Sequence, residues 1–267
     1  MSTAEIIGER GLSAAGERSA NAGRGLRVVE ETDDFIVVDK PPFLLAHPTR
    51  PTRAATLWSE LRNLLAYEIA NGGQVSIINR LDRETSGLVL VAKTGDAARR
   101  FGLMMQRQEI EKQYLAIVAG WPEWTRRTVD AAIARKGAHE ASAIWLKRAL
   151  HPHGAHAVTE FVVEERLIRP TPTGHKFSVI RALPRTGRTH QIRVHLASLG
   201  HPVVGDKIYG PDERLYLEFI ETGWTNDLAV KLSLPRHALH SSRLAIPGQK
   251  AWQSELPVDL RQWRRSS

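Results

Sequence analysis

Residues 79–87 combine charged and small side chains in a pattern that could carry out chemistry. An aspartate, Asp82, stands between two arginines, Arg80 and Arg83. Neighbouring cations favour the ionised form of a carboxyl group and lower its pKa. Asp82 is therefore predicted to be ionised and available as a nucleophile or a base. A surface cluster of ion pairs beside an ordinary turn explains the same residues equally well.

A second segment, residues 185–195, is rich in cations. Four arginines and no acid occur between Arg181 and Arg193. Thr189 is a suitable N-cap and predicts a helix over 189–199, whose first N–H groups would offer a site for phosphate. Arg193 lies off the apolar stripe of this helix and is predicted to reach a partner outside the core. The simpler alternative is a solvated basic face, although such faces usually mix charges of both signs.

Tyr114 lies near the start of an alternating segment that is typical of a strand. Period-two alternation places Tyr114, Ala116 and Val118 on one face of that strand. A tyrosine at this position most often packs in the core or at its rim. The functional alternative is an aromatic ring that lies flat against a nucleobase.

The strands and helices around these segments must hold them in place. Two β-branched runs, 26–30 and 35–39, surround an acidic turn and predict a hairpin. Residues 75–78 and 87–93 predict strands before and after the Asp82 loop. Strands outnumber helices and follow one another in runs, which favours an α+β fold with a mixed, mostly antiparallel central sheet and flanking helices. Further strands are predicted at 113–119, 128–134, 143–147, 158–163, 177–182, 238–246 and 252–255, and further helices from Leu57 to Asn71, after Thr94, at 211–222 and at 258–264.

Composition narrows the classes of function. The 267 residues include 37 lysines and arginines against 29 acidic residues, a net charge of +8 that favours a polyanionic partner, nucleic acid first. The absence of cysteine excludes disulfides, thiolate nucleophiles and cysteine-based zinc sites. No apolar run approaches the roughly 20 residues of a membrane span. We therefore expect a cytoplasmic protein without a membrane segment, with a flexible leader at 1–25 and one domain at 26–265.

Histidines and phosphate-binding motifs give no further candidate. His151, His153 and His156 are predicted to form a polar loop rather than a metal site, because no acidic or cysteine ligand stands beside them. The chain has no Gly-rich phosphate loop and no nucleophile elbow. A metal-dependent nuclease is disfavoured, because no cluster of carboxylates is apparent.

Together, the two arginine-rich segments resemble the RluA-type family of RNA pseudouridine synthases. This resemblance implies that family's catalytic fold with its active-site cleft, the isomerisation of uridine to pseudouridine in structured rRNA or tRNA, and no metal or organic cofactor. A monomer is the family expectation. The matching sequences are INRLDRETSGLVLVAKT (78–94), RTGRTHQIRVHLASLGHPVVGDKIYG (185–210), IVVDKPPFLLAHP (36–48), EKQYLAIVAGWP (111–122) and LHSSRL (239–244).

The resemblance also implies three catalytic residues. Asp82 takes the position of the essential aspartate, which acts as a nucleophile or as a base. Arg193 takes the position of the arginine that pairs with this carboxylate. Tyr114 takes the position of the tyrosine that stacks on the base and assists proton transfer at C5.

The remaining implied residues bind RNA. The target uridine must be flipped out of its stack, at a cost of a few kcal/mol. Arg80 matches the arginine that helps to fill the vacated space. The other residues expected to contact the RNA, mainly at its phosphates, are Arg83, Arg185, Arg188 and His190.

The sequence departs from the family at one motif position. The motif begins His-Arg-Leu-Asp, whereas Asn79 stands in place of the histidine. Asparagine keeps hydrogen-bonding capacity but cannot carry the charge, so the RNA contact of this position is in doubt. We also expect no S4-like RNA-binding module before Leu26, which would leave substrate choice to the catalytic domain. An RNA-binding module without relevant catalysis is the competing function.

Overall fold

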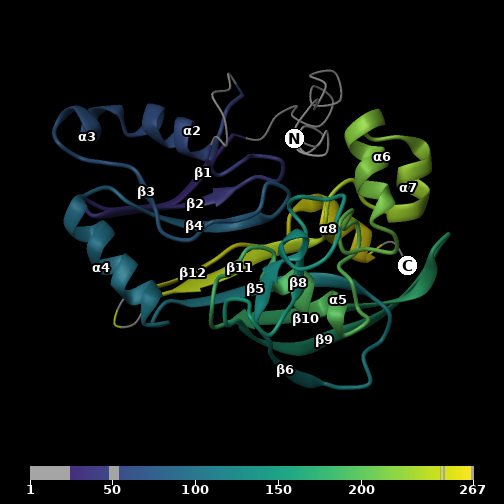
Figure 1. The fold of residues 1–267 in the computed structure, drawn as a ribbon. Helices are drawn as coiled ribbons and strands as arrows, with labels where there is room; N and C mark the ends of the chain where they lie inside the picture. The colour runs from purple at the N-terminus through teal and green to yellow at the C-terminus, as the bar shows by residue number, and fades with distance from the viewer. Residues whose placement is uncertain (1–24, 48–53, 247, 249, 266–267) are drawn as a thin grey trace, which may run out of the picture. The chain divides into compact units, whose positions relative to one another are not determined.

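The computed structural model describes residues 25–47, 54–246, 248 and 250–265 (Figure 1). The leader predicted at 1–25 lies outside the described residues, apart from Gly25. Within the described ranges, every helix is too short or too polar to cross a bilayer.

The chain forms two compact units. Residues 25–115 and 239–259 make up the first, which we call the Asp82 unit. Residues 116–238 and 260–265 make up the second, which we call the Arg193 unit. The single catalytic domain predicted over the whole described chain stays a prediction.

In the Asp82 unit, five strands follow the order β1-β2-β4-β11-β5. The predicted hairpin is confirmed as the antiparallel pair β1–β2. β4, the strand predicted after the Asp82 loop, pairs antiparallel with β2 and β3 but parallel with β11, and its seven residues are all buried. The elements of this unit are β1 (Arg27–Glu31), β2 (Phe35–Lys40), α2 (Leu57–Leu64), α3 (Ala66–Ala70), β3 (Ser76–Ile77), β4 (Ser86–Ala92), α4 (Gly95–Gln106), the start of β5 (Glu111–Ala119), β11 (Leu239–Ala245) and β12 (Ala251–Gln253).

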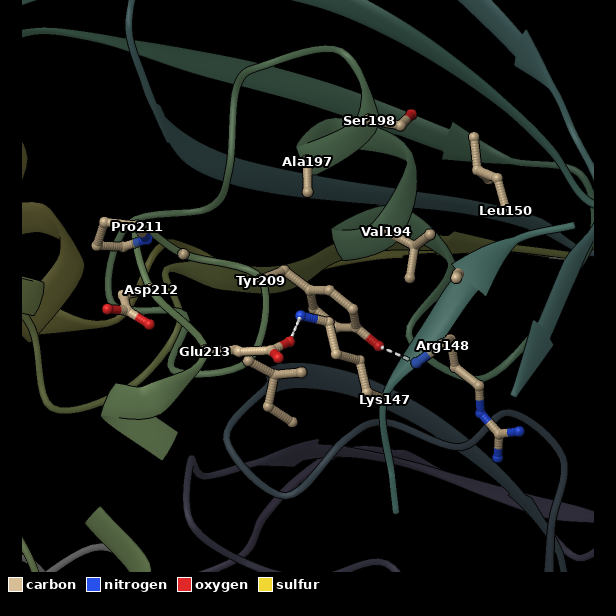
Figure 2. Close-up of a pocket in the computed structure, with 13 residues that line it drawn as sticks. Lys147, Arg148, Leu150, Val194, Ala197, Ser198, Tyr209, Pro211, Asp212 and Glu213 are labelled. Carbon is tan, nitrogen blue, oxygen red and sulfur yellow. Dashed lines mark hydrogen bonds and ion pairs between the residues drawn. The ribbon is translucent and has the colours of Figure 1, made fainter. Parts of the chain in front are cut away.

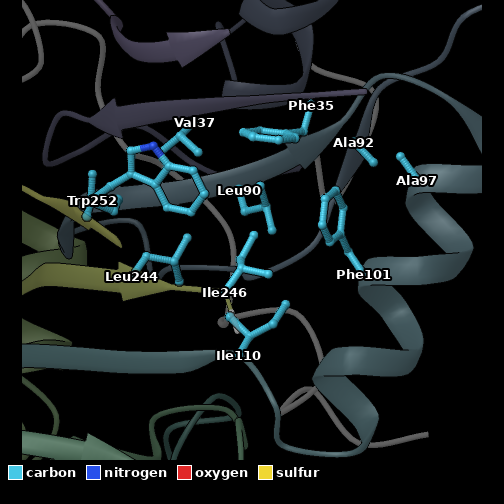
Figure 3. Close-up of a cluster of buried hydrophobic side chains, with 11 residues drawn as sticks. Phe35, Val37, Leu90, Ala92, Ala97, Phe101, Ile110, Leu244, Ile246 and Trp252 are labelled. Atoms are coloured by element: carbon cyan, nitrogen blue, oxygen red, sulfur yellow. The ribbon is translucent and has the colours of Figure 1, made fainter. Parts of the chain in front are cut away.

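One hydrophobic cluster holds this unit together (Figure 3). Phe35 on β2 makes edge-to-face contacts with Phe101 of α4 at 5.7 Å and with Trp252 of β12 at 5.6 Å between ring centroids. Thr94 caps α4 as predicted, because its Oγ1 accepts a hydrogen bond from the Ala97 N–H at 3.2 Å. The cluster therefore fixes the strands on which the Asp82 loop is mounted.

In the Arg193 unit, the end of β5 is followed by β10, β9 and β6, and β9 and β10 form a long antiparallel pair. The predicted α+β class with a mostly antiparallel sheet is confirmed. β7 and β8 form a separate two-stranded sheet. The elements are β6 (Arg126–Asp130), β7 (Ile133–Arg135), the 3-10 helix η2 (Lys136–Ala138), β8 (Arg148–Leu150), β9 (Val158–Thr171), β10 (Gly174–Pro184), α5 (Gln191–Ser198), α6 (Arg214–Thr222), α7 (Asn226–Leu232) and most of α8 (Val258–Arg265).

The strand predicted at 143–147 is wrong. Ser142 Oγ donates to the Ile144 carbonyl at 3.1 Å, and the Lys147 N–H donates to the same carbonyl at 3.1 Å. These local hydrogen bonds close a turn in place of a strand ladder, so β8 begins only at Arg148.

The start of the helix predicted at 189–199 is also wrong. α5 begins at Gln191, and its N-cap is His190 in a left-handed conformation with φ 59°. The His190 side chain makes no capping hydrogen bond. A short helix, α7, was missed although Thr225 caps it.

Candidate active site

Asp82 lies on a short loop between β3 and β4 whose main chain is anchored on both sides. Leu81 before it and Thr85 after it are buried, whereas Asp82 itself is half-buried. The Thr85 N–H donates to the Asp82 carbonyl at 3.1 Å and closes a turn. The loop therefore holds a carboxylate at the surface on a fixed backbone.

Asn79 ties this loop to β4. Its Oδ1 accepts from the Leu90 N–H at 2.8 Å, and its Nδ2 donates to the Leu88 carbonyl at 3.1 Å. One amide thus satisfies a backbone donor and a backbone acceptor of the same strand. The buried Asn79 side chain therefore has a structural role, and the RNA contact of this position is not tested by it.

Lys40 holds the far end of the loop. Its fully buried Nζ donates to the carbonyls of Pro41 and Leu44 at 2.9 Å each and to that of Arg83 at 3.2 Å. The ammonium group thus fixes the residue directly after Asp82. Sequence reasoning did not single out Lys40, although it lies in one of the motifs that carried the resemblance.

The structure brings Tyr114 into electrostatic reach of Asp82. Burial raises the pKa of Tyr114 to about 12; a hydrogen bond with the Ser241 side chain opposes this rise, and the Asp82 carboxylate adds to it. Only 8% of Tyr114 is exposed. Tyr114 is therefore neutral near pH 7 and can present a ring face or a hydroxyl, but not a phenolate.

Residues of β11 support both the Asp82 loop and Tyr114. Ser241 is the register partner of Gly87, where φ is +110° and a Cβ would stand 2.2 Å from the Ser241 carbonyl oxygen. Ser86 Oγ and His240 Nδ1 form a second link at 3.0 Å. Only glycine allows this approach, so the parallel pair brings Ser241 to the strand that follows the Asp82 loop.

Arg193 is buried and held by a carboxylate of its own unit. Its Nε donates to Asp206 Oδ2 at 2.6 Å and its Nη2 donates to Asp206 Oδ1 at 2.8 Å. Burial alone would raise the pKa of Asp206, but the charge and hydrogen bonds of Arg193 outweigh it and lower the pKa to about 2. Arg193 is only 4% exposed, so a solvated basic face is wrong for this residue.

Two of the three predicted catalytic residues belong to one unit. Asp82 and Tyr114 lie in the Asp82 unit, and Arg193 lies in the other. The pairing of Arg193 with Asp82 stays a prediction. Sequence reasoning also missed Asp206, although the matching motif contains it.

The predicted RNA-binding residues next to α5 stand on a braced loop. The Gln191 side chain accepts from the Thr186 hydroxyl at 2.7 Å and from the Arg188 N–H at 2.9 Å. Arg188 and Arg185 are exposed on this loop. In the Asp82 unit, Arg80 is exposed and Arg83 is half-buried.

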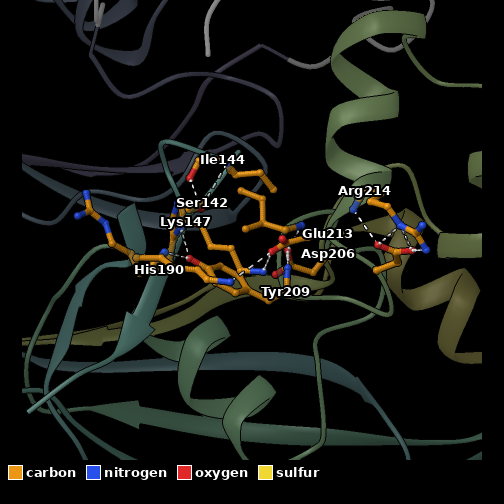
Figure 4. A network of polar contacts seen from close by, with 12 residues as sticks. Ser142, Ile144, Lys147, His190, Asp206, Tyr209, Glu213 and Arg214 are labelled. Carbon is orange, nitrogen blue, oxygen red and sulfur yellow. Dashed lines mark hydrogen bonds and ion pairs between the residues drawn. The ribbon is translucent and has the colours of Figure 1, made fainter. Parts of the chain in front are cut away.

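His190 is oriented by Tyr209 (Figure 4). The Tyr209 hydroxyl accepts from the Arg148 N–H at 2.8 Å and is also hydrogen-bonded to His190 Nδ1 at 2.8 Å. The Tyr209 ring also lies under the Arg193 guanidinium, with 5.0 Å from Cζ to the ring centroid.

A pocket of about 480 Å³ opens in the Arg193 unit (Figure 2). Lys147, Arg148, Tyr209 and Glu213 contribute its polar lining, and Lys147 and Glu213 form an ion pair. None of the three predicted catalytic residues lines it. Among the described residues, no group of three or more His, Cys, Asp or Glu side chains is arranged to hold a metal ion.

Known proteins resemble this chain along most of its length. The Ribosomal large subunit pseudouridine synthase D of Nitrosomonas europaea is 34% identical over 243 residues, which is 88% of this chain but only 63% of that protein. The protein of the same name from Pseudomonas aeruginosa is 34% identical over 268 residues, 97% of this chain and 77% of the relative. The chain thus spans less than two thirds of the first relative.

Solved structures show the same fold. Human RNA Pseudouridylate Synthase Domain Containing 1 is 27% identical with a TM-score of 0.63, covering 89% of this chain and 86% of that one. Human RNA Pseudouridylate Synthase Domain Containing 4 is 22% identical with a TM-score of 0.66, covering 88% and 90%, and supports the fold alone. The RNA pseudouridylate synthase family profile matches residues 34–198. The chain therefore belongs to the RNA pseudouridylate synthase family.

Proposed function

We propose that this chain isomerises uridine to pseudouridine in large-subunit ribosomal RNA, with Asp82 as its central catalytic group. The observation that carries the proposal is the Asp82 unit, where a half-buried carboxylate on a braced loop acts electrostatically on a buried, neutral Tyr114. The relatives named for the large ribosomal subunit support the choice of RNA.

The reaction conserves every atom of the uridine. The N1–C1′ bond breaks, the uracil rotates, C5 bonds to C1′, and the proton lost from C5 is balanced by one gained at N1. The change is redox-neutral and needs no external electron carrier. Asp82 either attacks C1′ as a nucleophile or removes a proton as a base, and both roles require the ionised carboxylate.

Tyr114 and Arg193 are proposed to support Asp82. Because Tyr114 is neutral, its ring face can stack on the uracil while its hydroxyl relays a proton. Arg193, whose orientation is fixed by Asp206, is proposed to stabilise the Asp82 carboxylate. The bidentate contact limits the motion of the guanidinium, so little further ordering would be needed when that pair forms.

The exposed cations are proposed to bind and open the RNA. Arg80 stands two residues before Asp82 and is exposed, which suits a side chain that fills the space left by a flipped uridine. Arg83, Arg185, Arg188 and His190 are proposed to contact the RNA around the target, mainly at its phosphates. We further propose that the protein acts as a monomer in the cytoplasm.

The test uses unmodified transcribed large-subunit rRNA and tRNA, with pseudouridine detected by carbodiimide adducts and primer extension. Wild-type protein should produce a new stop in the rRNA, and Asp82→Asn should produce none while binding the RNA as wild type does. Asp33→Asn, which alters an exposed aspartate in the β1–β2 turn, is the matched control. Wild-type binding without any new stop would instead favour an RNA-binding module, and a stop confined to tRNA would change the proposed substrate.

A further inference from the structure

Two arginines face each other across the small sheet of the Arg193 unit. The antiparallel register of β7 and β8 places Arg135 directly opposite Arg148. Like charges in this position destabilise a strand pair. The nearby carboxylate of Glu213 pairs with Lys147 and lies 3.9 Å from Lys136 Nζ, so it does not neutralise the arginines.

The two guanidinium groups also keep unused donors. Arg135 Nη1 and Arg148 Nε are shielded from solvent and have no hydrogen-bond partner among the described residues. A buried donor without a partner costs free energy, and the cost is larger for a charged group. An anion with several acceptor oxygens, held by other nitrogens of the two guanidinium groups, would offset the repulsion between them, and phosphate is such an anion.

An exposed tryptophan completes this surface. Trp145 is 63% exposed, and Arg135 Cζ lies 3.6 Å from its ring centroid. The cation–π contact holds the indole in place without burying it. An exposed, oriented indole beside unneutralised arginines is suited to an unpaired base and the phosphates next to it. We call β7, β8 and the connecting residues 136–147 the Trp145 ribbon.

The Trp145 ribbon is linked to the segment already proposed to contact RNA. The Tyr209 hydroxyl joins the Arg148 N–H to His190 Nδ1 (Figure 4). Figure 2 shows the Arg148 guanidinium directed away from Tyr209. The backbone of Arg148 is therefore fixed beside the predicted phosphate-binding residues, while its guanidinium group points away from Tyr209.

We propose that the Trp145 ribbon is a second RNA-binding surface, formed by residues other than the predicted catalytic ones. Arg135 and Arg148 bind backbone phosphates, and Trp145 stacks on an unpaired base of the substrate. This inference rests on the proposed function, because it takes the substrate to be RNA. Charge complementarity favours RNA over a protein partner, and the exposed indole favours single-stranded or looped RNA over a uniform duplex.

The test measures binding rather than isomerisation. Fluorescein-labelled fragments transcribed from large-subunit rRNA, and duplex DNA of equal length, are titrated at several salt concentrations. Trp145→Ala should weaken RNA binding about fivefold or more, as expected for one lost stacked base. The Arg135→Ala/Arg148→Ala variant should reduce the salt slope of log K by about 1.4–1.8, as expected for two lost phosphate contacts.

Matched controls distinguish the loss of contacts at the Trp145 ribbon from a general loss of folding or of RNA binding. Tyr67→Ala, at an aromatic residue that is 80% exposed on α3, should bind RNA as wild type does. Wild-type affinity and salt slope in both ribbon variants, with wild-type circular dichroism, would overturn the proposal. Equal weakening of RNA and duplex DNA by Trp145→Ala would overturn the stacking role.

The same samples distinguish this inference from the proposed function. If the isomerase proposal fails, the wild type forms no pseudouridine, yet the ribbon variants still bind RNA more weakly. If the ribbon proposal fails, the wild type forms pseudouridine and the ribbon variants bind as tightly as wild type does.

Discussion

At the scale of single residues, burial determines what Tyr114 can do. Its pKa of about 12 keeps the phenol neutral well above neutral pH. A mechanism that used a tyrosinate would accelerate as the pH approached the ordinary tyrosine value of about 10. A mechanism that uses the ring and the neutral hydroxyl would not.

We therefore expect the single-turnover rate to show no rise from tyrosine ionisation between pH 7 and pH 10. Tyr114→Phe should keep RNA affinity but lose roughly 10²-fold in rate, because the ring remains and the proton relay is removed. Rapid-quench assays on transcribed rRNA measure both effects. A wild-type rate that climbs with an apparent pKa near 10, and no such climb in Tyr114→Phe, would contradict the neutral role.

The Arg193–Asp206 pair leads to a stability prediction. The pKa of Asp206 is lowered to about 2 from 3.8, so the pair contributes stability above pH 3.8 that is lost as the pH falls toward 2. Asp206→Asn should cost about 3–5 kcal/mol near pH 7, because it leaves a buried guanidinium without its carboxylate. The same substitution should also make the free energy of unfolding depend less on pH between pH 3.8 and pH 2.

Urea unfolding between pH 2 and pH 7 measures both effects. The control is Asp212→Asn, which removes the partner of the exposed Arg214. This substitution should cost far less stability than Asp206→Asn does, because surface ion pairs contribute little. Equal losses from the two substitutions would show that the buried pair is no more important than a surface pair.

At the scale of elements, sequence patterns were reliable where the determining interactions are local. The β1–β2 hairpin, the Thr94 cap and the buried strand β4 follow from neighbouring residues. The left-handed His190 and the fully buried face of α5 do not, because they depend on contacts with β8, β9 and β10. Asp206 was missed for a similar reason, since a lone aspartate carries no sign of the arginine it will bind.

The close approach of β4 and β11 at Gly87 leads to a prediction about the loop that these strands hold. Gly87→Ala adds a methyl group 2.2 Å from the Ser241 carbonyl oxygen at a φ of +110°, so β4 and β11 must separate. We expect a loss of more than about 2 kcal/mol in stability and a large loss of activity, although no functional group is removed. Thermal unfolding and the pseudouridine assay measure these losses.

Gly102→Ala is the matched control, because its Cβ would meet nothing within 4 Å on α4. It should leave activity unchanged and raise stability by up to about 1 kcal/mol. If both substitutions behaved alike, the close approach of β11 would have no part in shaping the loop.

At the scale of the whole molecule, the resemblance assigned the motifs to the correct family. The pairing of strands distant in sequence brings the residues of these motifs together. Ser86 and His240 are 154 residues apart, and their contact arises from the one parallel strand pair described in the Asp82 unit. No local sequence pattern predicts the pairing of strands so far apart in the chain. Sequence reasoning could therefore name Asp82 and Tyr114 but could not identify Ser241 or Lys40 as their supports.

The net charge of +8 leads to the last prediction. If Arg185 and Arg188 bind phosphates, each contact releases counterions, and log K should fall with log salt by about 0.7–0.9 per contact. Arg185→Ala/Arg188→Ala should therefore reduce the salt slope by about 1.4–1.8 and leave the single-turnover rate at saturating RNA unchanged. Arg126→Ala should change neither quantity, because Glu160 already pairs with this exposed arginine at 2.7 Å. Anisotropy titrations from 50 to about 300 mM salt measure the slope, and single-turnover assays measure the rate. An unchanged slope in the double variant would show that these arginines do not contact phosphates. A lower rate at saturating RNA would show that they act in the isomerisation itself.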